Sequence, residues 1–204
     1  MIDEKWLEQT LAKMSVKEKV GQTLMPRIEG NFLSADSERF REYARWIERF
    51  HVGGLELFFT DVYSAAHLLN RLQAISGLPL LVGSDAETGM AHRVAGATHL
   101  THNMGLGASG SERMAYLQGK ITALEGIAVG VHLCEGPTVD VNVNPENPII
   151  AVRSFGDNPE FVSRMGAAFV RGLQDHGMIA CPKHFPGHGN TNVDSHMDMP
   201  VIHV

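Results

Sequence analysis

The stretch from residue 183 to residue 196, KHFPGHGNTNVDSH, gathers side chains that can bind polar groups and move protons. It holds one lysine, three histidines and one aspartate, and its two glycines and one proline fit neither a helix nor a strand. Loops usually lie on the surface, because a buried loop would leave backbone polar groups unpaired. Binding and catalytic residues are therefore frequent in loops. We therefore expect the chemistry of this chain to lie in this loop.

Three interpretations of the loop differ in their chemistry. A metal site would use the imidazoles and the carboxylate of the loop as ligands, but its histidines lack the helical spacing of a zinc protease motif. Acid–base catalysis would use Asp194 and His196, because two residues apart in an extended segment they can point the same way. The carboxylate would then accept the imidazole N–H and raise its basicity. A solvated surface loop is a less favoured interpretation than acid–base catalysis, because the pair Lys183–His184 shares the loop with this Asp-x-His pattern.

The elements around the loop alternate between apolar strand patterns and amphipathic helix patterns, which predicts a parallel α/β sheet. We expect strands in the segments 53–59, 78–85, 131–145 and 178–185. Helical spacing covers 6–14, 16–24, 34–50, 61–76, 111–130 and 158–177. The expected helix starts are Ser34 or Asp36 for the third of these, Asp61 for the fourth and Pro159 in the first turn of the last.

A (β/α)8 TIM-type barrel and an open doubly wound sheet both fit this alternation. The barrel is favoured because polar residues follow several strands, and barrel strand ends converge on one mouth; these residues are Asp85, Asp140, Asn142, Lys183 and His184. An open sheet would need a phosphate-binding glycine turn, which GASGS at 107–111 matches poorly. Since a barrel takes roughly 250 residues, we expect residues 1–204 to cover its N-terminal half to two-thirds, with the apolar run MPVIHV opening a further element.

Composition excludes several classes of protein. Hydrophobic residues make up 44% of the 204 residues and charged residues 20%, which is typical of a globular domain. A net charge of -6 without a basic cluster argues against nucleic acid as a partner. No apolar run could span a bilayer, and the N-terminus lacks an apolar signal core, so we expect a cytoplasmic protein. Cys134 and Cys181 are expected to be buried thiols rather than a disulfide.

Four blocks of the sequence resemble glycoside hydrolase family 3, in its β-N-acetylglucosaminidase branch. KHFPGHGNTNVDSH resembles the signature loop of that branch, and PLLVGSDAETGMAHRV is similar to the D-x-E-x-G block of the family. NVNPENPIIAVRSFGDNPEFV is similar to its NP-x-I-x-x-RSFG segment, and VGGLELF resembles its first-strand region. The blocks occur in the family's order along nearly the whole chain, which makes residues 1–204 the N-terminal part of one catalytic barrel domain.

The resemblance implies a retaining hydrolase that cleaves terminal β-linked N-acetylglucosamine through a covalent glycosyl-enzyme intermediate, without a metal or other cofactor. It implies that His196 is the general acid/base, oriented by Asp194, in place of the usual second carboxylate. It also implies that the terminal sugar is bound by Asp85, Arg93, Arg153, Lys183 and His184.

The nucleophilic aspartate of the family has no match among these residues and is expected beyond residue 204. Without a nucleophile no covalent intermediate forms, so a sugar-binding fragment without activity stays open as an alternative. A β-glucosidase and a glycoside phosphorylase of the same family also stay open. In each case the partner would be a carbohydrate, from the cell wall or from chitin, and neither nucleic acid nor a membrane.

Overall fold

The computed structural model describes residues 4–202, and its centre is a parallel sheet of five strands. The strands of this sheet are β1 (Arg27–Glu29), β2 (Gly54–Phe58), β4 (Leu81–Ser84), β6 (Leu133–Cys134) and β7 (Ile179–Ala180). A second, two-stranded sheet pairs β3 (Thr60–Asp61) with β5 (Val94–Ala95). The helices are α1 (Glu4–Lys13), α2 (Val16–Gly21), α3 (Glu38–Phe50), α4 (Val62–Ile75), α5 (Asn103–Ser109), α6 (Glu112–Val129) and α7 (Pro159–Gln174).

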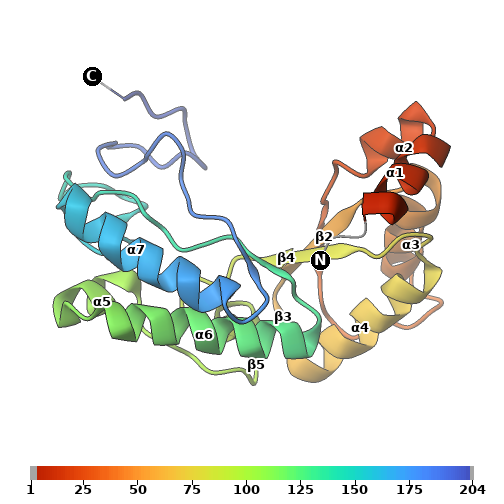
Figure 1. Cartoon of the computed structure of the whole chain (residues 1–204), viewed down its shortest axis with the longest axis horizontal. Coiled ribbons are helices and arrows are strands. Elements are labelled where there is room, and N and C mark those ends of the chain that lie inside the picture. The colour runs from red at the N-terminus through yellow and green to blue at the C-terminus, as the bar shows by residue number, and fades with distance from the viewer. Residues whose placement is uncertain (1–3, 203–204) are drawn as a thin grey trace.

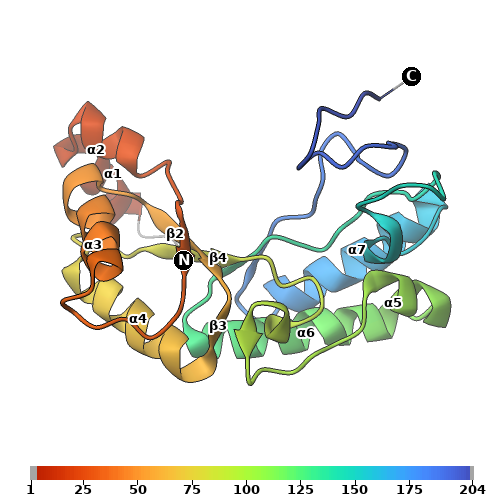
Figure 2. The ribbon, with the colours of Figure 1, turned by 180° about the vertical axis from the view of Figure 1, so that it is seen from behind.

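The order of the strands decides between the two predicted architectures. In the described residues the order in the sheet is β1-β2-β4-β6-β7, so each strand pairs in parallel with its neighbours along the chain. A doubly wound sheet reverses its strand order at the ligand-binding crevice, whereas a barrel wall does not. The helices lie outside the strands, and the segment after β7 rises above α7 (Figures 1 and 2). The fold is therefore part of a TIM-type α/β barrel, as the sequence predicts.

The helix starts follow side-chain caps, and one prediction about them is wrong. Asp61 caps α4 through hydrogen bonds from the backbone N–H groups of Tyr63 and Ser64, as expected. The helix predicted at 34–50 begins later, because Ser37 caps it and Ser34 and Asp36 lie in the preceding turn. A serine oxygen that reaches an N–H three residues on satisfies one of the free donors of the first turn.

The segment 131–145 forms less strand than its alternating pattern predicts. Only Leu133–Cys134 lie in β6, and a cis peptide bond joins Gly136 to Pro137 directly after it. Because proline has no N–H to donate, it ends the ladder, and only one further bridge forms, between Thr138 and Lys183.

The two cysteines of the chain differ in burial. Cys134, in strand β6, is buried as expected, but Cys181 is exposed and both are free thiols. The prediction of two buried thiols is therefore wrong for Cys181. It follows β7 directly, where the chain leaves the sheet, so its apolar neighbours in sequence do not cover it.

Helices α6 and α7 approach closely at two glycines. A Cβ atom on Gly172 would lie 2.1 Å from the Tyr116 carbonyl oxygen, and one on Gly119 would lie 2.3 Å from the Phe169 carbonyl oxygen. We expect Gly172→Ala to lower the free energy of unfolding by about 1–3 kcal/mol, because two backbones must separate. Gly77→Ala is the control, since no atom lies within 4 Å of its Cβ position. Thermal unfolding that gives the same shift for both variants would contradict this packing.

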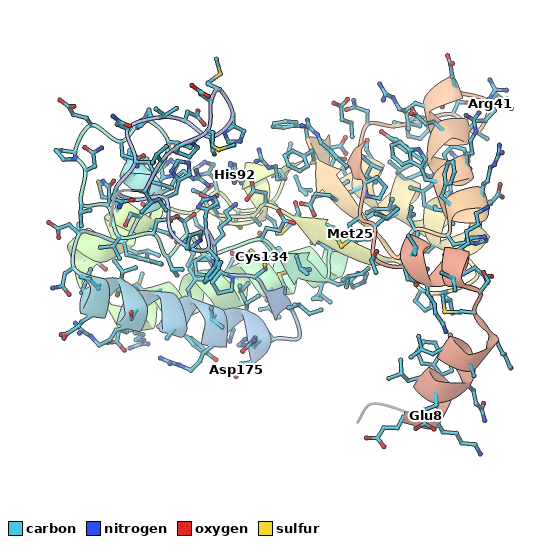
Figure 3. The ribbon with its side chains drawn as sticks, turned by 90° about the horizontal axis from the view of Figure 1, so that it is seen from above. Glu8, Met25, Arg41, His92, Cys134 and Asp175 are labelled. Atoms are coloured by element: carbon cyan, nitrogen blue, oxygen red, sulfur yellow. The ribbon has the colours of Figure 1, made fainter. Side chains whose placement is uncertain are left out.

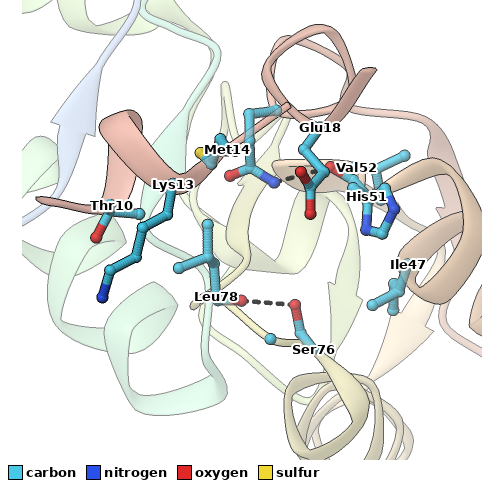
Figure 4. A pocket seen from close by; sticks show the side chains of 11 residues that line it. Thr10, Lys13, Met14, Glu18, Ile47, His51, Val52, Ser76 and Leu78 are labelled. Carbon is cyan, nitrogen blue, oxygen red and sulfur yellow. Dashed lines mark hydrogen bonds between the residues drawn. The ribbon is translucent and has the colours of Figure 1, made fainter. Parts of the chain in front are cut away.

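A pocket of about 350 Å³ lies at the amino ends of the strands, between α1, α2 and the ends of α3 and α4. Figure 4 shows Lys13, Glu18, His51 and Leu78 around it. His51 and Leu78 precede β2 and β4, so this pocket lies at the opposite end of the strands from Asp85 and Lys183. It is therefore separate from the mouth where a barrel carries its active site. Among the described helices, none is both long and apolar enough to cross a membrane.

Candidate functional site

Five charged side chains form a row of alternating sign at the carboxyl ends of the strands. We call them the charged row: Arg93, Asp85, Lys183, Glu87 and Arg153. Arg93 donates to Asp85 at 2.6 Å, and Lys183 donates to both Asp85 and Glu87. Arg153 donates to both oxygens of Glu87, with Nε and Nη2 at 2.9 and 2.7 Å. Each carboxylate therefore lies between two cations.

The chain reaches this arrangement through strand ends and one glycine turn. Asp85 follows β4 directly, and Lys183 pairs with Thr138 just beyond β7. Gly89 has φ of 84° and turns the chain after Glu87, so that Arg93 returns toward Asp85. A side chain at position 89 would strain the backbone and lie 2.7 Å from the Thr98 carbonyl oxygen.

Opposite charges hold Glu87 and Lys183 in their ionised forms against the effect of burial. Burial alone would raise the pKa of Glu87, but the hydrogen bonds from Arg153 and the charge of Lys183 lower it to about 2. Burial alone would lower the pKa of Lys183, but Glu87 and Asp85 raise it above its usual value. The side chain of Lys183 is 17% exposed and that of Glu87 is 5% exposed, so solvent screens these charges weakly.

The histidine next to Lys183 is fixed by a buried aspartate. His184 Nδ1 lies 2.6 Å from Asp140 Oδ2, and its Nε2 lies 3.4 Å from Arg153 Nη2. Burial alone would raise the pKa of Asp140, but the hydrogen bonds from His184 and from the His188 backbone N–H lower it. Since an ionised Asp140 accepts from Nδ1–H, the Nε2 of neutral His184 is left as an acceptor toward the charged row.

Asp194 and His196 form a second, more exposed arrangement, which we call the loop pair. His196 Nδ1 lies 2.6 Å from Asp194 Oδ1, and the His196 backbone N–H donates to the same oxygen at 2.9 Å. These hydrogen bonds lower the pKa of Asp194. Because Nδ1 faces a carboxylate, Nε2 of His196 is the atom free to exchange a proton with a ligand, and its side chain is 75% exposed.

One buried histidine connects the loop pair to the site. His188 donates its backbone N–H to Asp140 Oδ1 at 2.5 Å, and its Nε2 lies 3.0 Å from Ser195 Oγ. Ser195 stands between the two residues of the loop pair, so Asp140 binds both His184 and the base of the loop. The neighbouring pocket of about 540 Å³ is lined in part by Asp140, Lys183 and His184.

Comparison with known proteins assigns the chain to a family. Residues 15–204 match the description "Glycosyl hydrolase family 3 N terminal domain". The chain belongs to glycosyl hydrolase family 3. It is 37% identical over 174 residues to β-hexosaminidase A of Pseudoalteromonas piscicida, which covers 79% of this chain and 29% of that protein.

Two solved structures of family-3 proteins are similar to this chain. A β-N-acetylglucosaminidase from Paenibacillus sp. is 38% identical with a TM-score of 0.85, over 93% of this chain and 36% of that one. A β-glucoside phosphorylase is 31% identical with a TM-score of 0.87, over 96% of this chain and 35% of that one. The chain thus spans about a third of the length of these relatives.

This family-3 domain brings the predicted residues together in two groups. The five predicted sugar-binding residues all lie within the charged row and His184, and the predicted dyad forms the loop pair. Glu87 was missed as a candidate, and Asp140 was expected at the barrel mouth but was given no role there. Glu87 stands two residues after Asp85 in the D-x-E pattern, and Asp140 is polar within an apolar segment, so both carried a signal in the sequence.

A metal centre was one interpretation of the signature loop. Within residues 4–202, no group of three or more His, Cys, Asp or Glu side chains is placed to hold a metal ion. The acidic side chains of the charged row are instead bonded to lysine and arginine. The arrangement can therefore offer paired donors and acceptors to hydroxyl groups of a ligand.

Proposed function

We propose that this chain forms the N-terminal part of a retaining glycosidase that removes terminal β-linked N-acetylglucosamine. The observation that carries the proposal is the 2.6 Å contact between His196 Nδ1 and Asp194 Oδ1 in the loop that follows the charged row. Such a contact prepares the imidazole to act as both acid and base near neutral pH. The names of the hexosaminidase relatives support the choice of sugar.

The charged row would hold the sugar through its hydroxyl groups. Carboxylates accept hydrogen bonds from hydroxyls, and lysine and arginine donate to their oxygens, so a hydroxyl placed between the two kinds of group meets both needs. The row is preorganised, because each of its members already has a partner of opposite charge. The ligand therefore does not have to order these side chains on binding.

The reaction would run in two steps at the sugar C1 atom. In the first, a carboxylate supplied by the chain beyond residue 204 forms a bond to C1, the glycosidic C1–O bond breaks, and His196 gives the leaving oxygen its proton. In the second, His196 takes a proton from water, the water oxygen forms a bond to C1, and the bond to the carboxylate breaks. No cofactor enters either step.

A phosphorylase is the second candidate, and the loop pair itself favours it. Phosphate would attack C1 in place of water in the second step, and it needs no general base because it already carries negative charge. A histidine in the acid/base role admits this anion, whereas a second carboxylate would repel it. The similarity to a β-glucoside phosphorylase supports this alternative.

Rates on aryl glycosides test the proposal. We expect the full-length protein to hydrolyse aryl N-acetyl-β-glucosaminides at least about tenfold faster, in kcat/KM, than aryl β-glucosides, because one well-placed polar contact is worth about that factor. Equal or reversed rates would contradict the choice of sugar. Phosphate that raises the rate and appears in the product as a sugar 1-phosphate would favour the phosphorylase.

A further inference from the structure

Glu56 is a buried carboxyl group that the proposed reaction does not use. It lies in the middle of β2 and is 8% exposed, and neither of its side-chain oxygens receives a hydrogen bond within the described part of the chain. Its neighbours Leu55 and Leu57 face the core, so the alternation of a strand places Glu56 on the opposite face, toward the barrel interior. An ionised carboxylate without donors is costly in such a place.

The space for Glu56 comes from a glycine on the next strand. Glu56 pairs in register with Gly83 of β4, and a Cβ atom on Gly83 would lie 2.4 Å from Glu56 Oε2. The same position would be 3.0 Å from Met25 Cε and 3.4 Å from Leu133 Cδ2. The carboxyl group therefore lies across Gly83 among apolar atoms, beside Met25, which Figure 3 places close to the strands.

The charged groups that act on Glu56 come from the strands around it. Asp85 and Glu135 stand two residues after Gly83 and Leu133, which places them on the same interior face, one layer closer to the site. Lys183 acts on Glu56 from beyond β7. Arg27, its register partner on β1, instead lies over the Phe58 ring with its guanidinium carbon 4.2 Å from the ring centre. No cation is therefore bonded to Glu56 among residues 4–202.

Glu135 is the charged group that acts most strongly on Glu56. Two ionised carboxylates repel each other, so a neighbouring carboxyl group favours the protonated form of a buried one. Burial first, and then the charge of Glu135, raise the pKa of Glu56 to about 8. The burial of Glu56 with no donor or cation bonded to it among the described residues therefore favours its protonated form.

We propose that Glu56 is a positioning residue that works as a neutral acid: it keeps its proton, places no negative charge beneath Asp85, and so keeps Lys183 between Asp85 and Glu87. If Glu56 lost this proton, a further negative charge would lie beneath Asp85, and it would compete with Asp85 and Glu87 for the Lys183 ammonium group. The neutral form therefore preserves the alternation of charge in the row.

Thermal unfolding at several pH values tests the protonation state of Glu56. A neutral and an ionised Glu56 predict opposite signs for the change in melting temperature that Glu56→Gln causes at high pH. A pKa raised from about 4.5 in the unfolded chain to about 8 in the fold gives stability that is complete below pH 4.5 and is lost as the pH rises to 8. Glu56→Gln keeps the size of the side chain and is neutral at every pH. We expect its melting temperature to match wild type at pH 5 and to exceed it by about 5 °C or more at pH 8.

The matched control is Glu29→Gln, because Glu29 lies on the adjacent strand β1 and its side chain is 50% exposed. Its difference from wild type should not change between pH 5 and pH 8. A melting temperature of Glu56→Gln below that of wild type at pH 7–8 would overturn the proposal, since it would mean that Glu56 is ionised and bonded to a cation.

Sugar binding tests the positioning role, and this part rests on the proposed function. Calorimetry with N-acetylglucosamine should show wild type binding at least about fivefold more weakly at pH 9 than at pH 6.5, and Glu56→Gln binding equally at both. The same loss in both proteins would overturn the positioning role. Absence of binding in both at every pH would refute the proposed function instead, while the unfolding data would still decide whether Glu56 is neutral.

Discussion

Lys183→Met is expected to lower the free energy of unfolding by about 3–5 kcal/mol, the cost of breaking a buried ion pair by removing one partner. Lys183 is bonded to both Asp85 and Glu87, and its side chain is 17% exposed. Methionine keeps most of the volume of lysine but donates no hydrogen bond. Asp85 keeps Arg93 and Glu87 keeps Arg153, so we expect a folded but less stable protein rather than an unfolded one.

Chemical denaturation measures this loss, and Lys17→Met is the control because Lys17 is exposed in the short helix α2. The control should change the free energy of unfolding by less than about 0.5 kcal/mol. Lys183→Met should also abolish detectable binding of N-acetylglucosamine, because the donor at the centre of the charged row is gone. A variant as stable as the control would show that the arginines alone neutralise the two carboxylates.

Much of the fold could be predicted because its signals are local. Asp61 and Pro159 mark helix starts through contacts within four residues, and the apolar runs around Leu55 and Val82 mark buried strands. The later start of α3 was missed because Ser34, Asp36 and Ser37 are equivalent as cap residues in sequence. The structure places Ser37 at the cap, with Phe40 and Tyr43 of α3 packed in or against the core.

The candidate site was predictable in its residue types but not in its pairing. Arg153 and Glu87 are 66 residues apart in sequence, and Lys183 and Asp85 are 98 apart. Nothing in the local sequence indicates which carboxylate each cation will meet. The pairing depends on how the strands β4, β6 and β7 align, which brings their carboxyl ends together. Asp194 and His196 are the opposite case: their contact spans two residues, and the sequence predicts it directly.

The position of the Glu56 side chain could not be predicted from the sequence pattern. The segment GGLELFF predicts a strand from its apolar residues, and a single charged residue in it would normally face solvent. The sheet is covered by helices on one face and closes toward a barrel interior on the other, so neither face of β2 offers solvent. Only the register with Gly83 shows where the carboxyl group fits.

His196→Ala is expected to lower kcat/KM by about 10²–10⁴-fold for a substrate with a poor leaving group, the usual contribution of a positioned general acid. kcat/KM reports the first step, in which the departing oxygen needs a proton. An aryl group that leaves as a stable anion needs no proton, so its kcat/KM should fall by less than about tenfold. Asp194→Ala should show the same pattern with a smaller loss, because the imidazole remains but is no longer oriented.

The second step gives an independent check on the same residue. Without His196 no base activates water, so the covalent intermediate should accumulate with the good leaving group and kcat should fall even where kcat/KM does not. Azide carries its own charge and needs no base, so its addition should restore kcat and yield the glycosyl azide. His99→Ala, at an exposed histidine outside the loop, is the control. Equal losses for good and poor leaving groups, without rescue by azide, would mean that His196 shapes the loop and moves no proton.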